Sequence, residues 1–259
     1  TASDNCGVTS LTNSFNSGTT LSGAVFPLGA TIVSWTARDA AGNSRVCTFR
    51  VNVQDLTDPT VQSCPAPIVV SNTTGVCGAA VTYTVLFQDN CDGTGKTGTL
   101  IEGLTSGSIF PVGTTTVIWR YVDVASNDFA ECQFTVKVND TQFPTITCPG
   151  NITVNTDGTI SGGAGGSPVI TAFGPCGVQL RYTAPVGTDN CPIPMTDNIS
   201  GLGAGPNFFA YNGIYTETWR TTDASGNATT CSFSITVLDP VAPKVTCPSS
   251  VTVNNILGK

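Results

Sequence analysis

The chain has 259 residues, and its 17 acidic against 10 basic side chains give a net charge of −7. This balance argues against binding of nucleic acid or an anionic membrane, because both select clustered lysine and arginine. Eleven cysteines with no histidine exclude the common zinc sets and favour disulfide bonds, which indicates an extracellular or cell-surface protein. No apolar run reaches the ~18 residues that a membrane span needs, so we expect no direct membrane insertion.

The most informative stretch is Thr114–Val138. It predicts two strands joined by a turn, because apolar residues alternate with polar ones both before and after that turn. Its pattern of Trp, Asp, Asn, Cys and Phe recurs in Thr31–Val53 and in Thr216–Val237, and the three tryptophans are 84 and 100 residues apart. Such self-similarity indicates an array of one module. No helical periodicity longer than a turn or two is present, so the chain is predicted to be all-β.

In chain order, the repeats divide the sequence into four parts. Residues 1–57 hold the C-terminal part of repeat one, 58–141 repeat two, 142–241 repeat three, and 242–259 the N-terminal part of repeat four. Each repeat ends in an Asp-x-x-x-Pro junction, whose φ-locked proline favours a stiff linker. Repeat three carries a Gly-rich insertion at Ser161–Ser167, predicted to be a mobile or re-ordered loop, or else a contact loop. Since both ends fall inside a repeat, we expect a segment of a longer exported protein.

The repeated motifs are those of a known family. In repeat two they are Cys64-Pro65, Asp89-Asn90-Cys91, Phe110–Gly113, Trp119, Asp123–Asn127, Cys132–Val138 and the closing Asp140. With these motifs the chain resembles the HYR (hyalin repeat) module, an immunoglobulin-like sandwich of extracellular proteins and large bacterial surface adhesins. The resemblance implies tandem immunoglobulin-like β-sandwiches in a linear array, and it does not fix what is bound.

Two disulfide schemes stay open within this resemblance. An immunoglobulin-like strand order favours Cys6–Cys47, Cys91–Cys132 and Cys191–Cys231, with Cys64–Cys77 and Cys148–Cys176 as local clips and Cys247 left single. Simpler members of the family imply Cys64–Cys132 instead. That second scheme leaves Cys77 and Cys91 to pair across a strand of ~30 Å, which is geometrically hard.

Aspartates recur at three places in the repeats, and calcium is the cofactor that they suggest, because hard cations take oxygen ligands. Asp4, Asp89 and Asp189 lie in the Asp-Asn-Cys loops; Asp39, Asp123 and Asp223 open the hairpin turns; and Asp55, Asp140 and Asp239 end the repeats. A repeat-ending aspartate beside the loop of the next repeat would let one ion stiffen the joint. The alternative is structural, because Asp and Asn side chains stabilise turns by bonding nearby backbone N–H groups.

Catalysis is not expected, because a Ser or Cys nucleophile would lack its histidine base and only three scattered glutamates are present. The tryptophans are in phase with core positions, which favours packing over glycan stacking. We expect a non-enzymatic structural and adhesive segment, acting as a disulfide-stiffened rod or filament. Its expected partners are other repeats of the same chain, like filaments, or surface glycans and proteins. The alternatives are a ligand- or glycan-binding module that uses the loop insertion, and accessory repeats of an extracellular hydrolase.

Overall fold

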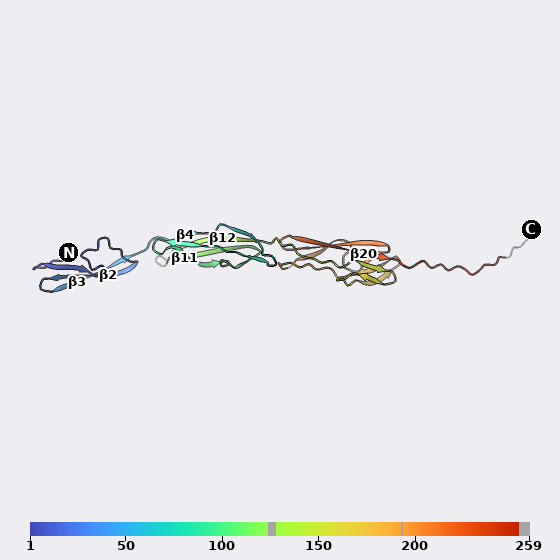
Figure 1. The fold of residues 1–259 in the computed structure, drawn as a ribbon, viewed down its shortest axis with the longest axis horizontal. Coiled ribbons are helices and arrows are strands. Elements are labelled where there is room, and N and C mark those ends of the chain that lie inside the picture. The colour runs from blue at the N-terminus through green and yellow to red at the C-terminus, as the bar shows by residue number, and fades with distance from the viewer. Residues whose placement is uncertain (124–127, 193, 254–259) are drawn as a thin grey trace, which may run out of the picture. The chain divides into compact units, whose positions relative to one another are not determined.

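The computed structural model of the chain describes residues 1–123, 128–192 and 194–253. Every regular element in these residues is a β-strand, as Figure 1 shows. The all-β prediction is therefore confirmed. No helix in this part of the chain has the length and apolar character that a membrane crossing requires.

The first predicted repeat contributes a single sheet of three strands in the order β1-β2-β3. They are β1 (Val8–Asn13), β2 (Gly29–Asp39) and β3 (Ser44–Val53). Strands β2 and β3 are antiparallel, with Trp35 opposite Cys47. Strand β3 has no neighbour on its other side among the described strands, and Phe49 on it is 41% exposed.

The second predicted repeat forms a sandwich. Its strands are β4 (Thr60–Ser63), β5 (Ile68–Ser71), β6 (Gly78–Ala80), β7 (Leu86–Asp89), β8 (Gly93–Lys96), β9 (Thr99–Glu102), β10 (Ile109–Pro111), β11 (Gly113–Val122) and β12 (Phe129–Asn139). One sheet has the order β5-β12-β11-β9, a second has β4-β7-β8, and β10 pairs with β6. The long antiparallel strands β11 and β12 lie side by side (Figure 1). The core is made by fully buried side chains such as Phe87, Phe110, Val117 and Val136.

The third predicted repeat forms a similar sandwich. Its strands are β13 (Ile152–Asn155), β14 (Ile160–Gly162), β15 (Val169–Gly174), β16 (Gly177–Arg181), β17 (Met195–Ser200), β18 (Asn207–Ala210), β19 (Gly213–Thr222) and β20 (Ala228–Leu238). A five-stranded sheet, β14-β13-β20-β19-β17, packs against a three-stranded sheet, β15-β16-β18. Both sheets contribute to one buried cluster, including Val154 and Ile235 from the first and Leu180 and Phe209 from the second. This packing confirms the immunoglobulin-like sandwich.

Contacts divide the chain into two compact units: Thr1–Val70 with Ala80–Val138, and Ser71–Ala79 with Asn139–Lys259. The boundary does not follow the predicted repeats. The loop Ser71–Ala79 belongs to repeat two in sequence but to the second unit in space. Each unit therefore contains residues on both sides of one predicted joint.

The Gly-rich insertion is ordered by backbone hydrogen bonds. Gly162 is the last residue of the edge strand β14, where it faces Ile152 of β13. The N–H of Gly163 then donates to the carbonyl of Asn151 at 2.9 Å, and the N–H of Thr183 donates to the carbonyl of Gly166 at 2.6 Å. The insertion is thus a re-ordered edge of the sandwich.

Candidate functional site

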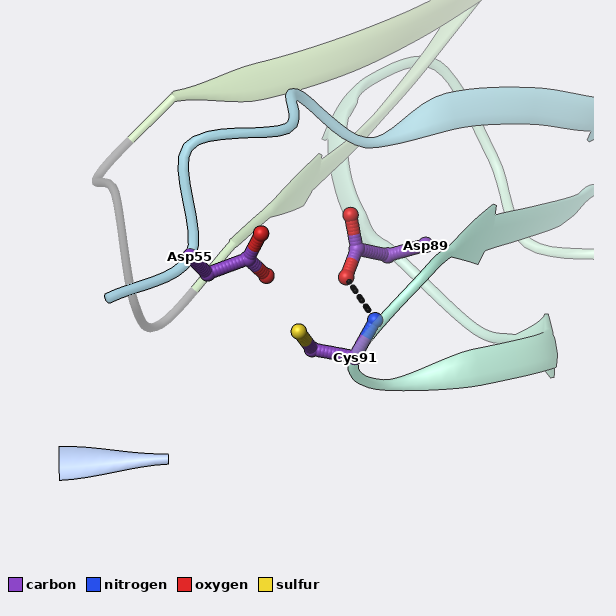
Figure 2. A group of neighbouring side chains, drawn as sticks. All are labelled: Asp55, Asp89 and Cys91. Carbon is purple, nitrogen blue, oxygen red and sulfur yellow. Dashed lines mark hydrogen bonds between the residues drawn. The ribbon is translucent and has the colours of Figure 1, made fainter. Parts of the chain in front are cut away.

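Three side chains converge where the first repeat joins the second. Asp55 lies in the linker after β3, Asp89 ends β7, and Cys91 lies in the turn that follows. Figure 2 shows their side chains pointing toward one another. One ligand atom from each lies within 4.8 Å of the others, and the two aspartates are only 6% and 8% exposed. We call this group the first joint cluster.

Each aspartate of the first joint cluster has one satisfied and one orphaned oxygen. Asp89 Oδ2 accepts the N–H of Cys91 at 2.8 Å, and Asp55 Oδ1 accepts the N–H of Thr57 at 3.1 Å. The buried Asp89 Oδ1 and Asp55 Oδ2 accept no hydrogen bond of normal geometry from the described residues. Burying a carboxylate oxygen without a strong partner is costly, and a cation placed between these two oxygens would offset that cost.

The electrostatics of the first joint cluster favour an ionised Asp55 carboxylate and a protonated Cys91 thiol. The thiol of Cys91, followed by the N–H of Thr57, lowers the pKa of Asp55. In return, the hydrogen bond to Asp55 and burial raise the pKa of Cys91 to about 11. Cys91 is therefore an unreactive thiol at neutral pH, because the thiolate is the nucleophilic form.

Two further aspartates extend the negative charge at this joint. Asp92 and Asp123 each bring a carboxylate oxygen within 4.8 Å of Asp89 and of one another. Asp92 also accepts the hydroxyl hydrogen of Tyr121, and this bond, with burial, raises the pKa of Tyr121 to about 12. Asp92 was not among the predicted ligands, because no aspartate follows the Asp-Asn-Cys motif in the other repeats.

The second unit contains the equivalent group. Asp140 ends repeat two, Asp189 and Cys191 belong to the Asp-Asn-Cys loop of repeat three, and their ligand atoms lie within 4.8 Å of one another. Asp189 Oδ2 accepts the N–H of Cys191 at 2.9 Å, just as Asp89 does for Cys91. Asp140 Oδ2, Asp189 Oδ1 and Asn190 Oδ1 are buried and accept no hydrogen bond from the described residues. We call this group the second joint cluster.

The other predicted ligands do not belong to such groups within the described residues. In the hairpin turns, Asn43 donates its backbone and side-chain N–H groups to Asp39, and Asn227 donates in the same way to Asp223. The side chain of Asn43 is the main cause that lowers the pKa of Asp39. These two aspartates follow the structural alternative, stabilising the turn. The exposed Asp4 accepts the N–H of Cys6, and the exposed Asp239 accepts the N–H of Val241 and the hydroxyl of Thr156, which lies 83 residues away in sequence.

The two joint clusters have the donor chemistry of a hard cation site. Both clusters contain two aspartates and a cysteine, but the cysteines differ, since Cys191 is disulfide-bonded and Cys91 is not. A thiol ligand is therefore not common to both sites, which argues against a soft metal. Calcium prefers carboxylate, amide and carbonyl oxygens. An open pocket of about 520 Å³ is lined by Asp55 of the first joint cluster, together with Asp58 and Asp128.

The disulfides correct the first of the two predicted schemes. The structure forms Cys64–Cys132, Cys148–Cys231 and Cys77–Cys191. The first two join the Cys-Pro segment to the last strand, as the simpler family members implied, because β5 lies beside β12 and β13 beside β20. The pairs Cys91–Cys132, Cys191–Cys231, Cys64–Cys77 and Cys148–Cys176 are therefore wrong. Cys6, Cys47, Cys91, Cys176 and Cys247 are free and exposed, so Cys6–Cys47 is not formed either.

The bridge Cys77–Cys191 links two repeats, which neither scheme predicted. It spans 114 residues of sequence, with the two Cα atoms 4.7 Å apart. Both cysteines lie in the second unit, because the loop Ser71–Ala79 packs with repeat three. Beside the bridge, the side-chain amide of Asn190 donates to the carbonyl of Val76 at 3.3 Å. The second joint cluster is thus adjacent to a covalent connection between repeats.

Glu217 is a buried polar residue that the sequence analysis did not single out. Its carboxylate accepts the N–H groups of Leu202 and Gly203, both at 2.8 Å, the hydroxyl of Tyr182 at 2.9 Å and the amide of Asn198 at 3.1 Å. Burial, followed by the bond to Glu217, raises the pKa of Tyr182. With all its neighbours engaged as donors, Glu217 holds a loop in place.

Comparisons with known proteins agree with these features. The model of the HYR domain matches residues 1–53 and 54–138. Hyalin of Strongylocentrotus purpuratus is 32% identical over 96% of this chain and 19% of that protein, and Hyalin of Lytechinus variegatus is 30% identical over 97% and 44%. The chain therefore spans less than half of these relatives.

Solved structures give weaker likenesses. The ectodomain of human Desmocollin-1 has a TM-score of 0.28 at 14% identity, covering 85% of this chain and 50% of that one. Mouse Cadherin-23 EC22-24 has a TM-score of 0.27 at 13% identity, covering 81% and 74%. At these TM-scores the structural likeness supports no statement about function.

Proposed function

Because the chain belongs to the HYR domain family, we propose that it is a non-enzymatic structural and adhesive segment whose joints between repeats are stiffened by calcium and by disulfides. Its location is extracellular or at the cell surface, as expected from the cysteines. The observation that carries the proposal is the convergence of a repeat-ending aspartate with the Asp-Asn-Cys loop of the next repeat at two successive joints.

A cation at such a joint would act on the linker. Asp55 belongs to the linker, whereas Asp89 belongs to the body of repeat two, and their carboxylates repel one another at short range. Calcium bound here would supply the missing positive charge and tie the linker to the loop. Asp140 and Asp189 have the same relation in the second unit. The effect would be to restrict bending at both joints.

Direct contacts support the same conclusion for the second joint. The side chain of Asn72 accepts the N–H of Thr141 at 3.0 Å, and the N–H of Gly75 donates to Gln142 Oε1 at 2.7 Å. The linker is therefore held by the loop of repeat two that also carries Cys77. A joint fixed by a covalent bridge, hydrogen bonds and an ion suits a spacer that transmits force.

The rest of the chain supports a non-enzymatic role. The sequence has no histidine, and its three glutamates lie on three different strands. Glu131 forms an ion pair with Arg120 at 2.9 Å, and Glu217 holds a loop. Glu102 is the last residue of the strand β9. The Gly-rich insertion packs onto its own sandwich, so the proposal does not use it for ligand binding. Adhesion would then depend on the array and its surfaces.

Small-angle X-ray scattering of the whole chain tests joint stiffening. We expect a narrower distribution of dimensions with calcium than with a chelator, and a broader one for the double variant Asp55→Asn, Asp89→Asn. The matched control is Asp39→Asn, which removes a turn aspartate outside the joint clusters. Identical scattering with calcium and with chelator would refute calcium stiffening.

A further inference from the structure

The aspartates at the first joint form two overlapping groups. One is the first joint cluster, which contains Asp55, Asp89 and Cys91. The other contains Asp89, Asp92 and Asp123, with one carboxylate oxygen from each within 4.8 Å of the others. We call this second group the loop cluster. Its side chains all belong to repeat two, because Asp89 ends β7, Asp92 lies in the turn before β8, and Asp123 follows β11.

Hydrogen bonds of repeat two position the loop cluster. The N–H groups of Cys91 and Asp92 both donate to Asp89 Oδ2, at 2.8 and 3.2 Å. The hydroxyl of Tyr121, on β11, donates to Asp92 Oδ2. The ring of Tyr121 in turn stacks on the fully buried Phe87, with ring centroids 5.7 Å apart. An ion that binds here would therefore meet a site that the fold has already ordered.

The loop cluster also contains a buried oxygen without a partner. Asp89 is 8% exposed, and its Oδ1 accepts no hydrogen bond of normal geometry from the described residues, since both N–H groups of the turn donate to Oδ2. In the same part of the chain, neither Asp89 nor Asp92 forms an ion pair with a basic side chain. Such burial is costly. The neighbouring carboxylates of Asp92 and Asp123 add repulsion, which a cation would reverse.

Charge balance distinguishes this joint from the second one. Four carboxylates belong to the two groups, and when ionised they carry four negative charges, which two divalent cations balance and one does not: Asp55, Asp89, Asp92 and Asp123.

At the second joint, the described group has two carboxylates, Asp140 and Asp189, so one divalent cation suffices there. The position of Asp92 is taken by Pro192 in repeat three and by Gly7 in repeat one. A carboxylate directly after the Asp-Asn-Cys motif is therefore particular to repeat two.

We propose that the loop cluster binds a second divalent hard cation, calcium, so that the first joint holds two ions with Asp89 as their shared ligand. Asp92 and Asp123 offer carboxylate oxygens, the ligands that calcium prefers, and no cysteine belongs to this group. Water and backbone carbonyls would complete the coordination. This inference rests on the proposed function for the ion in the first joint cluster, and it adds an ion held within repeat two.

The two ions act on different parts of the joint. The ion in the first joint cluster ties the linker, through Asp55, to the loop that carries Asp89. The ion in the loop cluster ties that same loop, through Asp123, to the end of β11. The loop between β7 and β8 is then fixed against the sheet, so a force on the linker passes to the body of repeat two.

Equilibrium dialysis of the whole chain against calcium, with the bound metal measured by atomic emission, counts the ions. Two joint clusters and the loop cluster predict three ions per chain at saturation. Asp92→Asn should bind two, because Asp92 belongs only to the loop cluster. Its side chain is half-buried, and asparagine can still accept the hydroxyl of Tyr121, so this variant keeps the fold. Asp55→Asn should also bind two ions, and the double variant one.

The matched control is Glu102→Gln, which removes an exposed carboxylate from the same repeat and should still bind three ions. An equal loss in this control would overturn the inference, because binding would then follow the net charge of the repeat. So would a chain that binds two ions, loses none in Asp92→Asn and loses one in Asp55→Asn; the proposed joint ion would survive that result. Loss in Asp92→Asn but not in Asp55→Asn would support the loop cluster and refute the joint ion. No bound calcium would overturn both.

A spectroscopic signal assigns the ion to the loop cluster. In Asp55→Asn, calcium should change the near-ultraviolet circular dichroism of tyrosine, because the hydroxyl of Tyr121 is bonded to Asp92. Adding Tyr121→Phe to this variant should remove the change, while dialysis still detects the ion. A spectrum that calcium leaves unaltered, or a change that persists in the phenylalanine variant, would contradict the assignment.

Discussion

Calcium should stabilise the third repeat through the second joint cluster, and the size of the effect follows from its ligands. The cluster offers three orphaned oxygens, from Asp140, Asp189 and Asn190, whereas calcium takes about six to eight. The remainder must come from backbone carbonyls and water, so the site belongs with weak extracellular modules, with a Kd of roughly 10⁻⁴–10⁻³ M. At about 10 mM calcium, mass action then gives about 1.4–2.7 kcal/mol of added stability.

A thermal melt measures this effect. For a repeat of about 100 residues, each kcal/mol shifts Tm by roughly 4–8 °C, so calcium should raise Tm by about 6–20 °C over a chelator. Asp189→Asn should remove most of the calcium-dependent Tm shift, since it removes one of the two negative charges, Asp140 and Asp189, that would bind the ion. The reasoning fails if calcium leaves Tm unchanged, or if Asp189→Asn keeps the full shift.

A matched control separates ion binding from general destabilisation. Asp223→Asn removes a carboxylate whose partners are the N–H groups of Ser225 and Asn227, so it should lower Tm in both conditions. Its calcium-dependent shift should equal that of the unmodified chain. A lost shift in this variant as well would mean that the ion acts through the fold as a whole.

Three further outcomes follow from the structure. The double variant Cys77→Ser, Cys191→Ser should lower the free energy of unfolding in urea by about 2–4 kcal/mol, because the bridge restricts the unfolded chain. Glu217→Ala should cost about 3–5 kcal/mol in the same assay, since the fully buried carboxylate leaves and one buried and three part-buried hydrogen bonds lose their acceptor. Alkylation of Cys91 should reach half its limiting rate near pH 11, and Asp55→Asn should move that midpoint down toward 9.0.

Each of these outcomes has its own control. Cys247→Ser removes a free thiol and should leave the unfolding curve of a dilute sample unchanged. If this variant lost as much free energy of unfolding as the double variant, the loss could not be assigned to the bridge. Glu131→Ala removes a partly exposed ion pair and should cost less than about 1 kcal/mol. For the thiol, a midpoint that Asp55→Asn does not move would contradict the hydrogen bond to the carboxylate.

The sequence predicted the strands, the sandwiches and the meeting of two aspartates at each joint, but not the cysteines beside them. Alternation of apolar residues specifies which side of a strand is buried, and the repeated motifs specify equivalent positions in successive repeats. The idea that a repeat-ending aspartate meets the next loop needed only the order of motifs along the chain. The structure brings Asp55 to Asp89 and Asp140 to Asp189.

What the sequence could not predict depends on contacts between repeats or on single departures from the pattern. The bridge from Cys77 to Cys191 forms because a loop of one repeat packs with the next, and no spacing within a repeat encodes that. Glu217 occupies the position where the other repeats have Val33 and Val117, so repetition predicted an apolar residue there. Its role became visible only with the loop donors around it.

The three bridges have overlapping spans, and this affects how the molecule tolerates proteolysis. The loop closed by Cys64–Cys132 overlaps that of Cys77–Cys191, which in turn overlaps that of Cys148–Cys231. Any single peptide bond cut between residues 64 and 231 therefore lies inside at least one closed ring. The two fragments stay joined by a disulfide until a reductant or a further cut releases them. A single proteolytic cut in this span therefore does not separate the two parts of the chain.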